Sequence, residues 1–252
     1  MNLPKNFEKE SAFKKLLNQL IYIYNYFICR KGEKVMEKIN KYIDHTLLEP
    51  NATQEQIDKV ISEAKKYQFA SVCVNPFWVK YVSEKLQGTK INTVTVIGFP
   101  LGATTTETKV FEATQAVANG ADECDMVQNI GAFLSEDYDV VLKDEKAVVE
   151  AVHSKEKKVK VILENCFLNS QQIKKACLIA EKSGADFVKT STGFAKYGAR
   201  AEDVKIMAAT VGTKMGIKAA GGIHTKAEAC QMIASGATRL GASASLKIIK
   251  EL

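Results

Sequence analysis

From about residue 36 onward, short runs rich in β-branched residues alternate with longer segments in which hydrophobic residues recur at helical spacing. This alternation predicts repeated βα units on a parallel sheet. Eight runs have the length and composition of strands. The predicted strands are Tyr42–Leu48, Ala70–Val74, Ile91–Gly98, Ala121–Val127, Val159–Glu164, Ala185–Lys189, Met215–Ala219 and Thr238–Gly241.

Helix-start signals lie between these runs. In a capping box, a short polar residue and a Glu or Gln three positions later satisfy the first free N–H groups of a helix. Proline in a first helical turn, as in Asn75-Pro76, is a further start signal because its missing N–H costs nothing there. The predicted capping boxes pair Thr53 with Gln56, Asn169 with Gln172, and Thr225 with Glu228.

Eight βα units predict the fold class α/β, as a (β/α)8 TIM barrel. A closed barrel is favoured over an open doubly wound sheet because an open sheet would leave two edges to protect. The open sheet stays the alternative. The predicted organisation is a single barrel domain over residues 36–252 with an N-terminal extension, residues 1–35.

The extension is basic and aromatic. It holds six of the 20 aromatic residues, and residues 1–36 contribute +4 of the formal net charge of +6. Three interpretations compete: a helix docking on the barrel or a partner, a weak membrane-surface anchor, and an upstream translation artefact with Met36 as the true start. A translation artefact or a disordered arm is favoured.

Charge and cysteine usage exclude several functions. The body of the chain is nearly neutral and has no basic stripe with interleaved aromatics, so no nucleic-acid partner is expected. The apolar run at residues 20–29 is too short to span a bilayer, so no membrane association is expected. Six scattered cysteines without a C-x-x-C pair predict neither metal nor disulfides. Free thiols fit a reducing, cytoplasmic location.

Two lysines close neighbouring predicted strands. Lys189 ends the sixth and Lys218 lies near the end of the seventh, and catalytic groups of such barrels lie at the carboxyl ends of strands. Neighbouring strands run about 4.8 Å apart, so the ammonium groups should lie close together. A like charge in a partly dry site lowers a lysine pKa from about 10.4 and exposes the lone pair of a nucleophile. Alternatively, both are ordinary surface lysines.

Strand four adds carboxylates. Asp125 lies in an apolar run, as a functional acid or as a buried group paired for structure. Glu123 shares its face but lies lower in the strand, so Asp125 is the better candidate for proton transfer with Lys218. Lys160 is a rival nucleophile near the amino end of its strand, and it ranks well below Lys189.

Glycine turns follow strands seven and eight. Backbone N–H groups in such turns, with a helix N-terminus behind them, form the usual phosphate site of barrels. His224 is a further candidate donor. Tight turns without a ligand are the simpler alternative. The predicted phosphate-binding residues are Gly193, Gly221, Gly222, Gly241 and Ser243.

The chain resembles the deoxyribose-phosphate aldolase family from about Met36 to its end. The segments that carry the resemblance are Asp44-His45-Thr46-Leu47-Leu48, Cys73-Val74-Asn75-Pro76, Val96-Ile97-Gly98-Phe99-Pro100-Leu101-Gly102, Asp125-Met126-Val127, Lys189-Thr190-Ser191-Thr192-Gly193 and Lys218-Ala219-Ala220-Gly221-Gly222.

The resemblance implies a class I aldolase, a lyase, that reversibly cleaves 2-deoxy-D-ribose 5-phosphate to D-glyceraldehyde 3-phosphate and acetaldehyde without metal or cofactor. It implies Lys189 as the Schiff-base lysine, Lys218 as the second lysine and Asp125 as the proton-transferring acid. Asp44 is interpreted as a partner that supports Lys218. Two departures bear on phosphate binding: Ala244 stands where a second serine is expected, and His224 replaces an arginine found in some members.

Two other functions stay open. One is a Schiff-base barrel aldolase that acts on a different phosphosugar. The other is a non-catalytic barrel whose N-terminal arm binds a partner or a membrane surface. The expected ligand is a small phosphosugar, and the sequence leaves open whether the chain is a homo-oligomer, dimer or tetramer.

Overall fold

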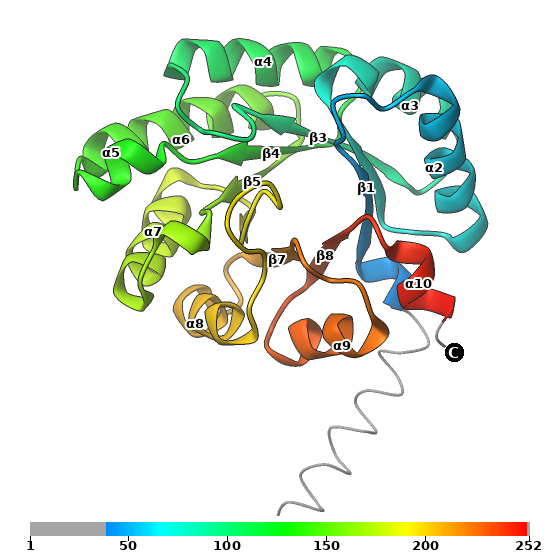
Figure 1. Ribbon diagram of the computed structural model, residues 1–252. Coiled ribbons are helices and arrows are strands. Elements are labelled where there is room, and N and C mark those ends of the chain that lie inside the picture. Colours follow the sequence, from blue (N-terminus) through cyan, green and yellow to red (C-terminus); the bar gives the residue numbers. More distant parts are fainter. Residues whose placement is uncertain (1–38, 251–252) are drawn as a thin grey trace, which may run out of the picture. The chain divides into compact units, whose positions relative to one another are not determined.

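The computed structural model describes residues 39–250. The N-terminal extension and the predicted boundary between residues 35 and 36 lie outside that range. The described part contains a closed barrel of eight parallel strands in chain order, in which β8 pairs with β1 (Figure 1). The strands are β1 Ile43–Leu47, β2 Ser71–Val74, β3 Asn92–Ile97, β4 Glu123–Val127, β5 Lys158–Ile162, β6 Phe187–Lys189, β7 Gly216–Ala220 and β8 Arg239–Ala242.

Closure of the sheet confirms the barrel and rules out the open doubly wound alternative. All eight predicted strands exist, and each overlaps its observed strand with ends that differ by at most two residues. The strands form because β-branched runs bury both faces, one toward the barrel interior and one toward the surrounding helices. Strand β4 is an example, since all five of its residues are buried.

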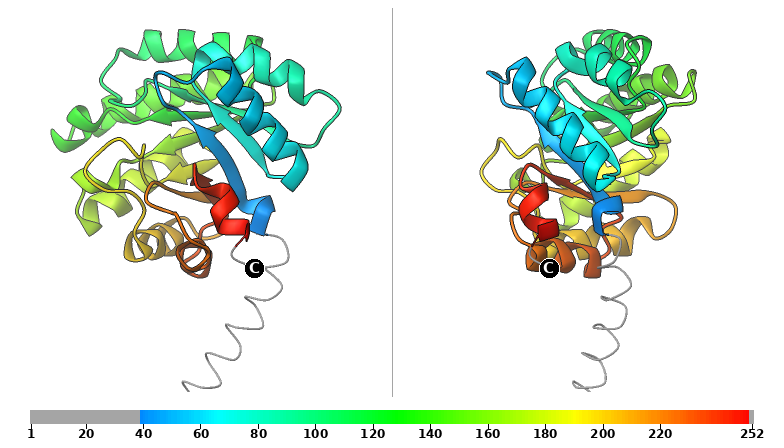
Figure 2. Two further views of the ribbon diagram at one scale, coloured as in Figure 1. Left: turned by 45° about the vertical axis from the view of Figure 1, so that its right-hand side comes forward. Right: turned by 90° about the vertical axis from the view of Figure 1, so that its right-hand side faces the viewer.

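Helices surround the strands, as the two further views in Figure 2 show. The three predicted capping boxes are formed, at Thr53, Asn169 and Thr225. Pro76 opens a short 3-10 helix that leads into α3. The helical segments are η1 Ile39–Tyr42, α2 Gln54–Tyr67, η2 Pro76–Trp78, α3 Val79–Leu86, α4 Thr106–Ala118, α5 Ile130–Leu134, α6 Tyr138–His153, η3 Asn165–Phe167, α7 Ser170–Ser183, α8 Ala201–Val211, α9 Lys226–Ala234 and α10 Ser245–Lys250.

The parallel arrangement decides where chemistry can occur. Since all strands run the same way, their carboxyl ends and the loops that follow them meet at one rim of the barrel. Within residues 39–250, no helix is both long and apolar enough to cross a membrane.

Candidate active site

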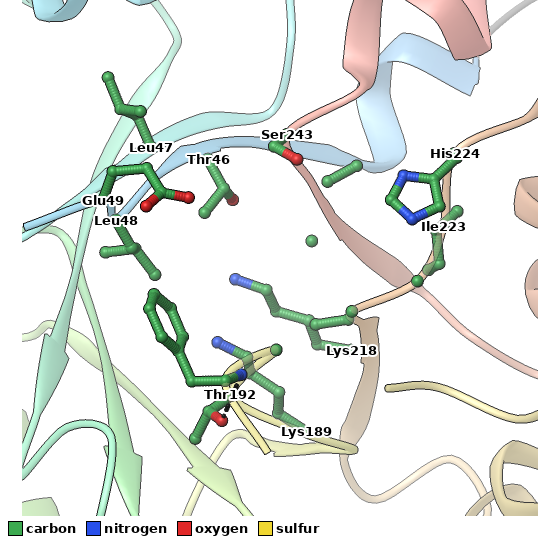
Figure 3. Close-up of a pocket in the computed structure, with 17 residues that line it drawn as sticks. Thr46, Leu47, Leu48, Glu49, Lys189, Thr192, Lys218, Ile223, His224 and Ser243 are labelled. Atoms are coloured by element: carbon green, nitrogen blue, oxygen red, sulfur yellow. Dashed lines mark hydrogen bonds between the residues drawn. The ribbon is translucent and has the colours of Figure 1, made fainter. Parts of the chain in front are cut away.

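Lys189 and Lys218 lie side by side. They are Cα partners in the pairing of β6 with β7, and both are almost fully buried, with 2% and 1% of their surface exposed. Each ammonium group donates a 2.8 Å hydrogen bond to the same atom, Oδ2 of Asp125. Figure 3 shows the two side chains entering one cavity together. They are therefore not ordinary surface lysines.

The loops that follow the two lysines are bound to each other. The Thr190 amide donates to the Lys218 carbonyl at 3.0 Å, and the Ser191 hydroxyl donates to the Ala220 carbonyl at 2.6 Å. Further along, Gly198 lies so close to Gly221 that an added Cβ would come within 2.1 Å of the Gly221 carbonyl oxygen. These contacts fix the two lysines relative to each other.

Asp125 is the shared acceptor of the site. It is fully buried on β4, and its second oxygen, Oδ1, accepts a 2.7 Å hydrogen bond from Lys160. Burial alone would raise the pKa of this carboxyl, but the cations Lys160, Lys189 and Lys218 outweigh it and hold the pKa well below its ordinary value. Asp125 is therefore ionised in the structure.

Asp44 on β1 contacts Lys218, as the interpretation from the sequence required. Its Oδ2 forms a 2.6 Å ion pair with the Lys218 ammonium group. Oδ1 accepts from the Ser71 hydroxyl at 2.6 Å and from the Arg239 guanidinium at 2.8 Å. Burial raises the pKa of this carboxyl, yet Lys218 and Arg239 more than offset it and lower the pKa. Asp44 thus places a second negative charge against Lys218.

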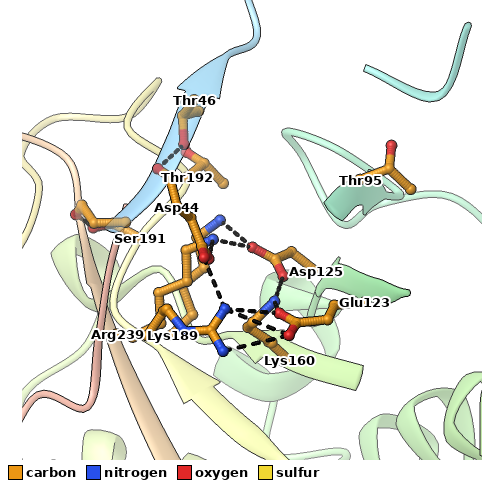
Figure 4. Close-up of polar contacts among 12 residues, drawn as sticks. Asp44, Thr46, Thr95, Glu123, Asp125, Lys160, Lys189, Ser191, Thr192 and Arg239 are labelled. Atoms are coloured by element: carbon orange, nitrogen blue, oxygen red, sulfur yellow. Dashed lines mark hydrogen bonds and ion pairs between the residues drawn. The ribbon is translucent and has the colours of Figure 1, made fainter. Parts of the chain in front are cut away.

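A layer of charges lies below the lysines, and of its members the sequence pointed to Glu123 and Lys160 but not to Arg239 or to the contacts that join them. Arg239 on β8 contacts Glu123 on β4, with an Nη1 to Oε2 distance of 3.1 Å, and Lys160 forms an ion pair with Glu123 as well as with Asp125. Figure 4 shows these side chains joined in one chain of polar contacts. The network pairs each of these buried charges with an opposite charge, as burial requires.

The interpretation of Lys160 needs correction in one respect. It lies in strand β5 as expected, but its side chain reaches Asp125 and so belongs to the site. Burial would lower the pKa of Lys160, whereas Asp125 and Glu123 raise it above its ordinary value. Lys160 is a fixed cation, which agrees with ranking it below Lys189 as a nucleophile.

The electrostatic environments of the two strand-end lysines differ in sign. Burial lowers the pKa of Lys189, with a smaller contribution from the charge of Lys218, and together they exceed the opposing effect of Asp125. Burial also acts to lower the pKa of Lys218, but Asp125 and Asp44 outweigh it and raise the pKa. The like charge of Lys218 was expected from the sequence to be the main cause of the lowered pKa of Lys189, whereas in the structure burial contributes more.

The lysines open into a cavity of about 440 Å³. All five predicted phosphate-binding residues line it, as do His224 and Thr192. In Figure 3, Ser243 and His224 lie on the side of the cavity away from Lys189. Within residues 39–250, no group of three His, Cys, Asp or Glu residues is arranged to hold a metal ion.

Comparison with known proteins gives the family. The sequence model of the protein family described as DeoC/LacD family aldolase matches residues 38–248 of the chain. The chain belongs to the DeoC/LacD aldolase family. Deoxyribose-phosphate aldolase from Clostridium novyi is 58% identical over 212 residues, which cover 84% of this chain and 95% of the relative. The deoxyribose-phosphate aldolase from Aciduliprofundum boonei is 57% identical over 215 residues, 85% of this chain and 97% of the relative.

Solved structures of the family share the fold. The tetrameric structure of deoxyribose phosphate aldolase from Aeropyrum pernix superposes with a TM-score of 0.82 at 31% identity, over 89% of this chain and 96% of that one. The resemblance noted from the sequence motifs is thus confirmed over most of the chain.

Proposed function

We propose that this chain is a deoxyribose-phosphate aldolase, a lyase that reversibly cleaves 2-deoxy-D-ribose 5-phosphate to D-glyceraldehyde 3-phosphate and acetaldehyde. The observation that carries the proposal is the buried Lys189 amine, whose pKa is lowered beside a lysine whose pKa is raised. An uncharged amine attacks a carbonyl, and a neighbouring cation stabilises developing negative charge.

Lys189 forms the covalent intermediate. Its Nζ attacks the C1 carbonyl of the open-chain sugar, and loss of water gives an iminium ion. The iminium accepts the electron pair of the C2–C3 bond while the proton of the C3 hydroxyl leaves, so glyceraldehyde 3-phosphate departs and an enamine remains. Protonation of the enamine and hydrolysis release acetaldehyde and restore the amine.

Asp125 and Lys218 move the protons. Asp125 Oδ2 lies 2.8 Å from both lysine nitrogens, within the distance that proton transfer requires. Asp125, acting with Lys218 and a water molecule, takes the C3 hydroxyl proton in the cleavage direction. Asp44 keeps Lys218 charged and in place through its 2.6 Å ion pair.

The phosphate binds at the glycine loops of the cavity, at Gly193, Gly221, Gly222, Gly241 and Ser243. All five line the same cavity as Lys189 and Lys218, which supports this assignment. Backbone N–H groups in such loops are suited to an anion. The metal-free and cofactor-free mechanism implied by the motifs is part of the same proposal, since every step above uses only protein groups and water.

Three further assignments belong to the proposal. The free thiols of Cys73, Cys124 and Cys177 in the described chain support a cytoplasmic location. The tetrameric Aeropyrum pernix relative supports a homo-oligomer. The family match from residue 38 supports a barrel domain that begins near Met36, with residues 1–35 as an extension.

Borohydride trapping tests the proposed function. Wild-type protein is treated with acetaldehyde and sodium borohydride, and the peptides are analysed by mass spectrometry. We expect one ethyl group on Lys189 and none on Lys218 or Lys160. A condensation assay with D-glyceraldehyde 3-phosphate as the acceptor then compares acetaldehyde with dihydroxyacetone phosphate as the donor, and only acetaldehyde should react. An unmodified Lys189, or preference for dihydroxyacetone phosphate, would overturn the proposal.

A further inference from the structure

Glu164 follows β5 in an unusual backbone conformation. Its φ of 54° and ψ of 62° lie in the left-handed region, which residues other than glycine seldom adopt and which persists only where the surroundings hold it. The side chain is also buried, with 1% of its surface exposed. Both features indicate that contacts with the surrounding structure hold this glutamate in place.

The Glu164 carboxylate accepts three hydrogen bonds from one residue, Thr192. The Thr192 amide donates to Oε2 at 3.2 Å and to Oε1 at 3.3 Å, and the Thr192 hydroxyl donates to Oε2. The same hydroxyl oxygen accepts a 3.0 Å hydrogen bond from the Phe194 amide. Through Thr192, Glu164 therefore holds the turn that consists of Thr192, Gly193 and Phe194.

This turn forms part of the cavity wall. Its three residues all line the cavity that holds Lys189 and Lys218. The Phe194 ring also packs edge-on against Phe99 at a centroid distance of 5.4 Å, which links the loop after β6 to the loop after β3. Movement of the turn would alter the cavity while leaving the lysine strands in place.

Two other glutamates provide a comparison within the same chain. Glu136 and Glu156 also have positive φ, of 61° and 58°, but both are exposed. Among these three glutamates, Glu164 alone combines the left-handed backbone with burial and contacts to a cavity-lining residue. The conformation by itself is common to all three, so the buried carboxylate is what distinguishes Glu164.

We propose that Glu164 is a positioning residue that holds the Thr192–Phe194 turn in the conformation that receives the substrate phosphate. The inference rests on the proposed function, because Gly193 is one of the assigned phosphate-binding residues. Glu164 touches no reacting atom in this account. It acts through the hydrogen bonds that Thr192 donates, and its loss should weaken phosphate binding more than it slows chemistry at Lys189.

The test compares two substrates in Glu164→Gln, which preserves the side-chain size. Gln has one acceptor oxygen in place of two and presents an N–H₂ donor to a partner that itself donates. We expect KM for 2-deoxy-D-ribose 5-phosphate to rise about tenfold, the affinity change that corresponds to the loss of roughly one hydrogen bond. The kcat/KM for unphosphorylated 2-deoxy-D-ribose should change less than about threefold. Thr192→Val should reproduce this pattern, and the double variant should be no worse than either single variant.

Matched controls separate the possible outcomes. Glu136→Ala and Glu156→Ala remove a left-handed glutamate elsewhere and should leave both substrates unaffected, while Thr192→Ser keeps the hydroxyl and should restore wild-type KM. Equal losses on both substrates, or no change in KM, would overturn the inference. Acetaldehyde trapping of the wild type is scored separately, so a protein that traps acetaldehyde but lacks the substrate difference refutes only the role of Glu164.

Discussion

Strands β6 and β7 each carry a lysine at the same level of the barrel, but the two lysines lie in different electrostatic environments. Lys189 and Lys218 are paired in register, are equally buried and bind the same oxygen of Asp125. Lys218 alone also contacts Asp44, at 2.6 Å. The pKa of Lys189 is lowered, while the pKa of Lys218 is raised.

The difference shows that burial alone does not produce a nucleophile. Burial lowers the pKa of both lysines, and the number of adjacent carboxylates decides the outcome. With one shared carboxylate the pKa of Lys189 stays lowered, whereas a second carboxylate raises the pKa of Lys218 and keeps it a cation. Asp44 is thus the residue that makes two similar lysines chemically distinct.

Replacement of the lysines should produce the largest effect. Lys189→Met removes the nucleophile, so cleavage of 2-deoxy-D-ribose 5-phosphate should fall at least about 1000-fold and acetaldehyde trapping should cease. Lys218→Met keeps the nucleophile and should retain trapping while cleavage is lost. Mass spectrometry of the trapped protein checks both. Trapping that persists in Lys189→Met would mean that another amine is the nucleophile.

Asp44→Asn makes the two environments more alike. Loss of this carboxylate should lower the pKa of Lys218, because the cation loses one of its two adjacent negative charges. We expect kcat/KM to fall roughly 10- to 100-fold. The decline of kcat/KM on the alkaline side should also begin at a lower pH than in the wild type. The pH profile of kcat/KM measures this.

Ser71→Ala is the matched control for that variant. It removes the hydroxyl that donates to Asp44 at 2.6 Å but keeps the charge. A profile for Ser71→Ala as altered as that of Asp44→Asn would show that orientation, and not charge, separates the lysines.

Gly198→Ala should disturb the alignment of the two strand ends. The added Cβ would lie 2.1 Å from the Gly221 carbonyl oxygen, far inside contact distance, so the loops after β6 and β7 must separate. We expect kcat/KM to fall about tenfold. Gly131→Ala is the control, since its Cβ would meet nothing closer than 3.7 Å. Steady-state kinetics that cannot distinguish the two variants would contradict the proposed contact.

Glu145 is a buried acid outside the lysine site, and its replacement should change the free energy of unfolding but not the activity. Burial, and secondly the charge of Asp144, raise its pKa to about 8. The folded state favours the protonated form of Glu145. The stability that this neutral carboxyl contributes is therefore fully present below the unfolded pKa near 4.5 and is lost as pH rises through about 8. Glu145→Gln should therefore be more stable than the wild type at pH 8, on the order of 2 kcal/mol, with unchanged kcat.

Urea unfolding at pH 5, 7 and 9 checks this prediction. The free energies of unfolding of Glu145→Gln and the wild type should diverge as the pH rises. Parallel curves would show that Glu145 is ionised in the folded protein.

The fold was predictable because its signals are local. Capping boxes such as Thr53 with Gln56 and the period of the apolar runs each lie within a few residues, and a parallel barrel brings strand ends together whatever the loops contain. Lys189 and Lys218 could therefore be paired in advance, and Asp125 assigned to the same rim.

The lower charge network was not predictable in the same way. Arg239 and Glu123 are separated by 116 residues, and their contact depends on how long side chains cross the barrel interior. Lys160 was expected to lie too far toward the amino end of its strand to reach the catalytic rim. Position in a strand does not show how far a long side chain extends, and Lys160 reaches Asp125. Glu164 gave no signal either, since a left-handed glutamate has no sequence pattern of its own.

The proposed chemistry requires Lys189 to lose its proton more readily than Lys218. The most direct test labels the native wild-type protein with an amine-reactive reagent across a pH series and quantifies modification of each lysine by mass spectrometry. We expect Lys189 to be labelled with an apparent pKa below that of a free lysine, and Lys218 to stay unlabelled throughout the range in which the protein is folded. Labelling of Lys218 before Lys189, or of both with the same apparent pKa, would contradict this requirement.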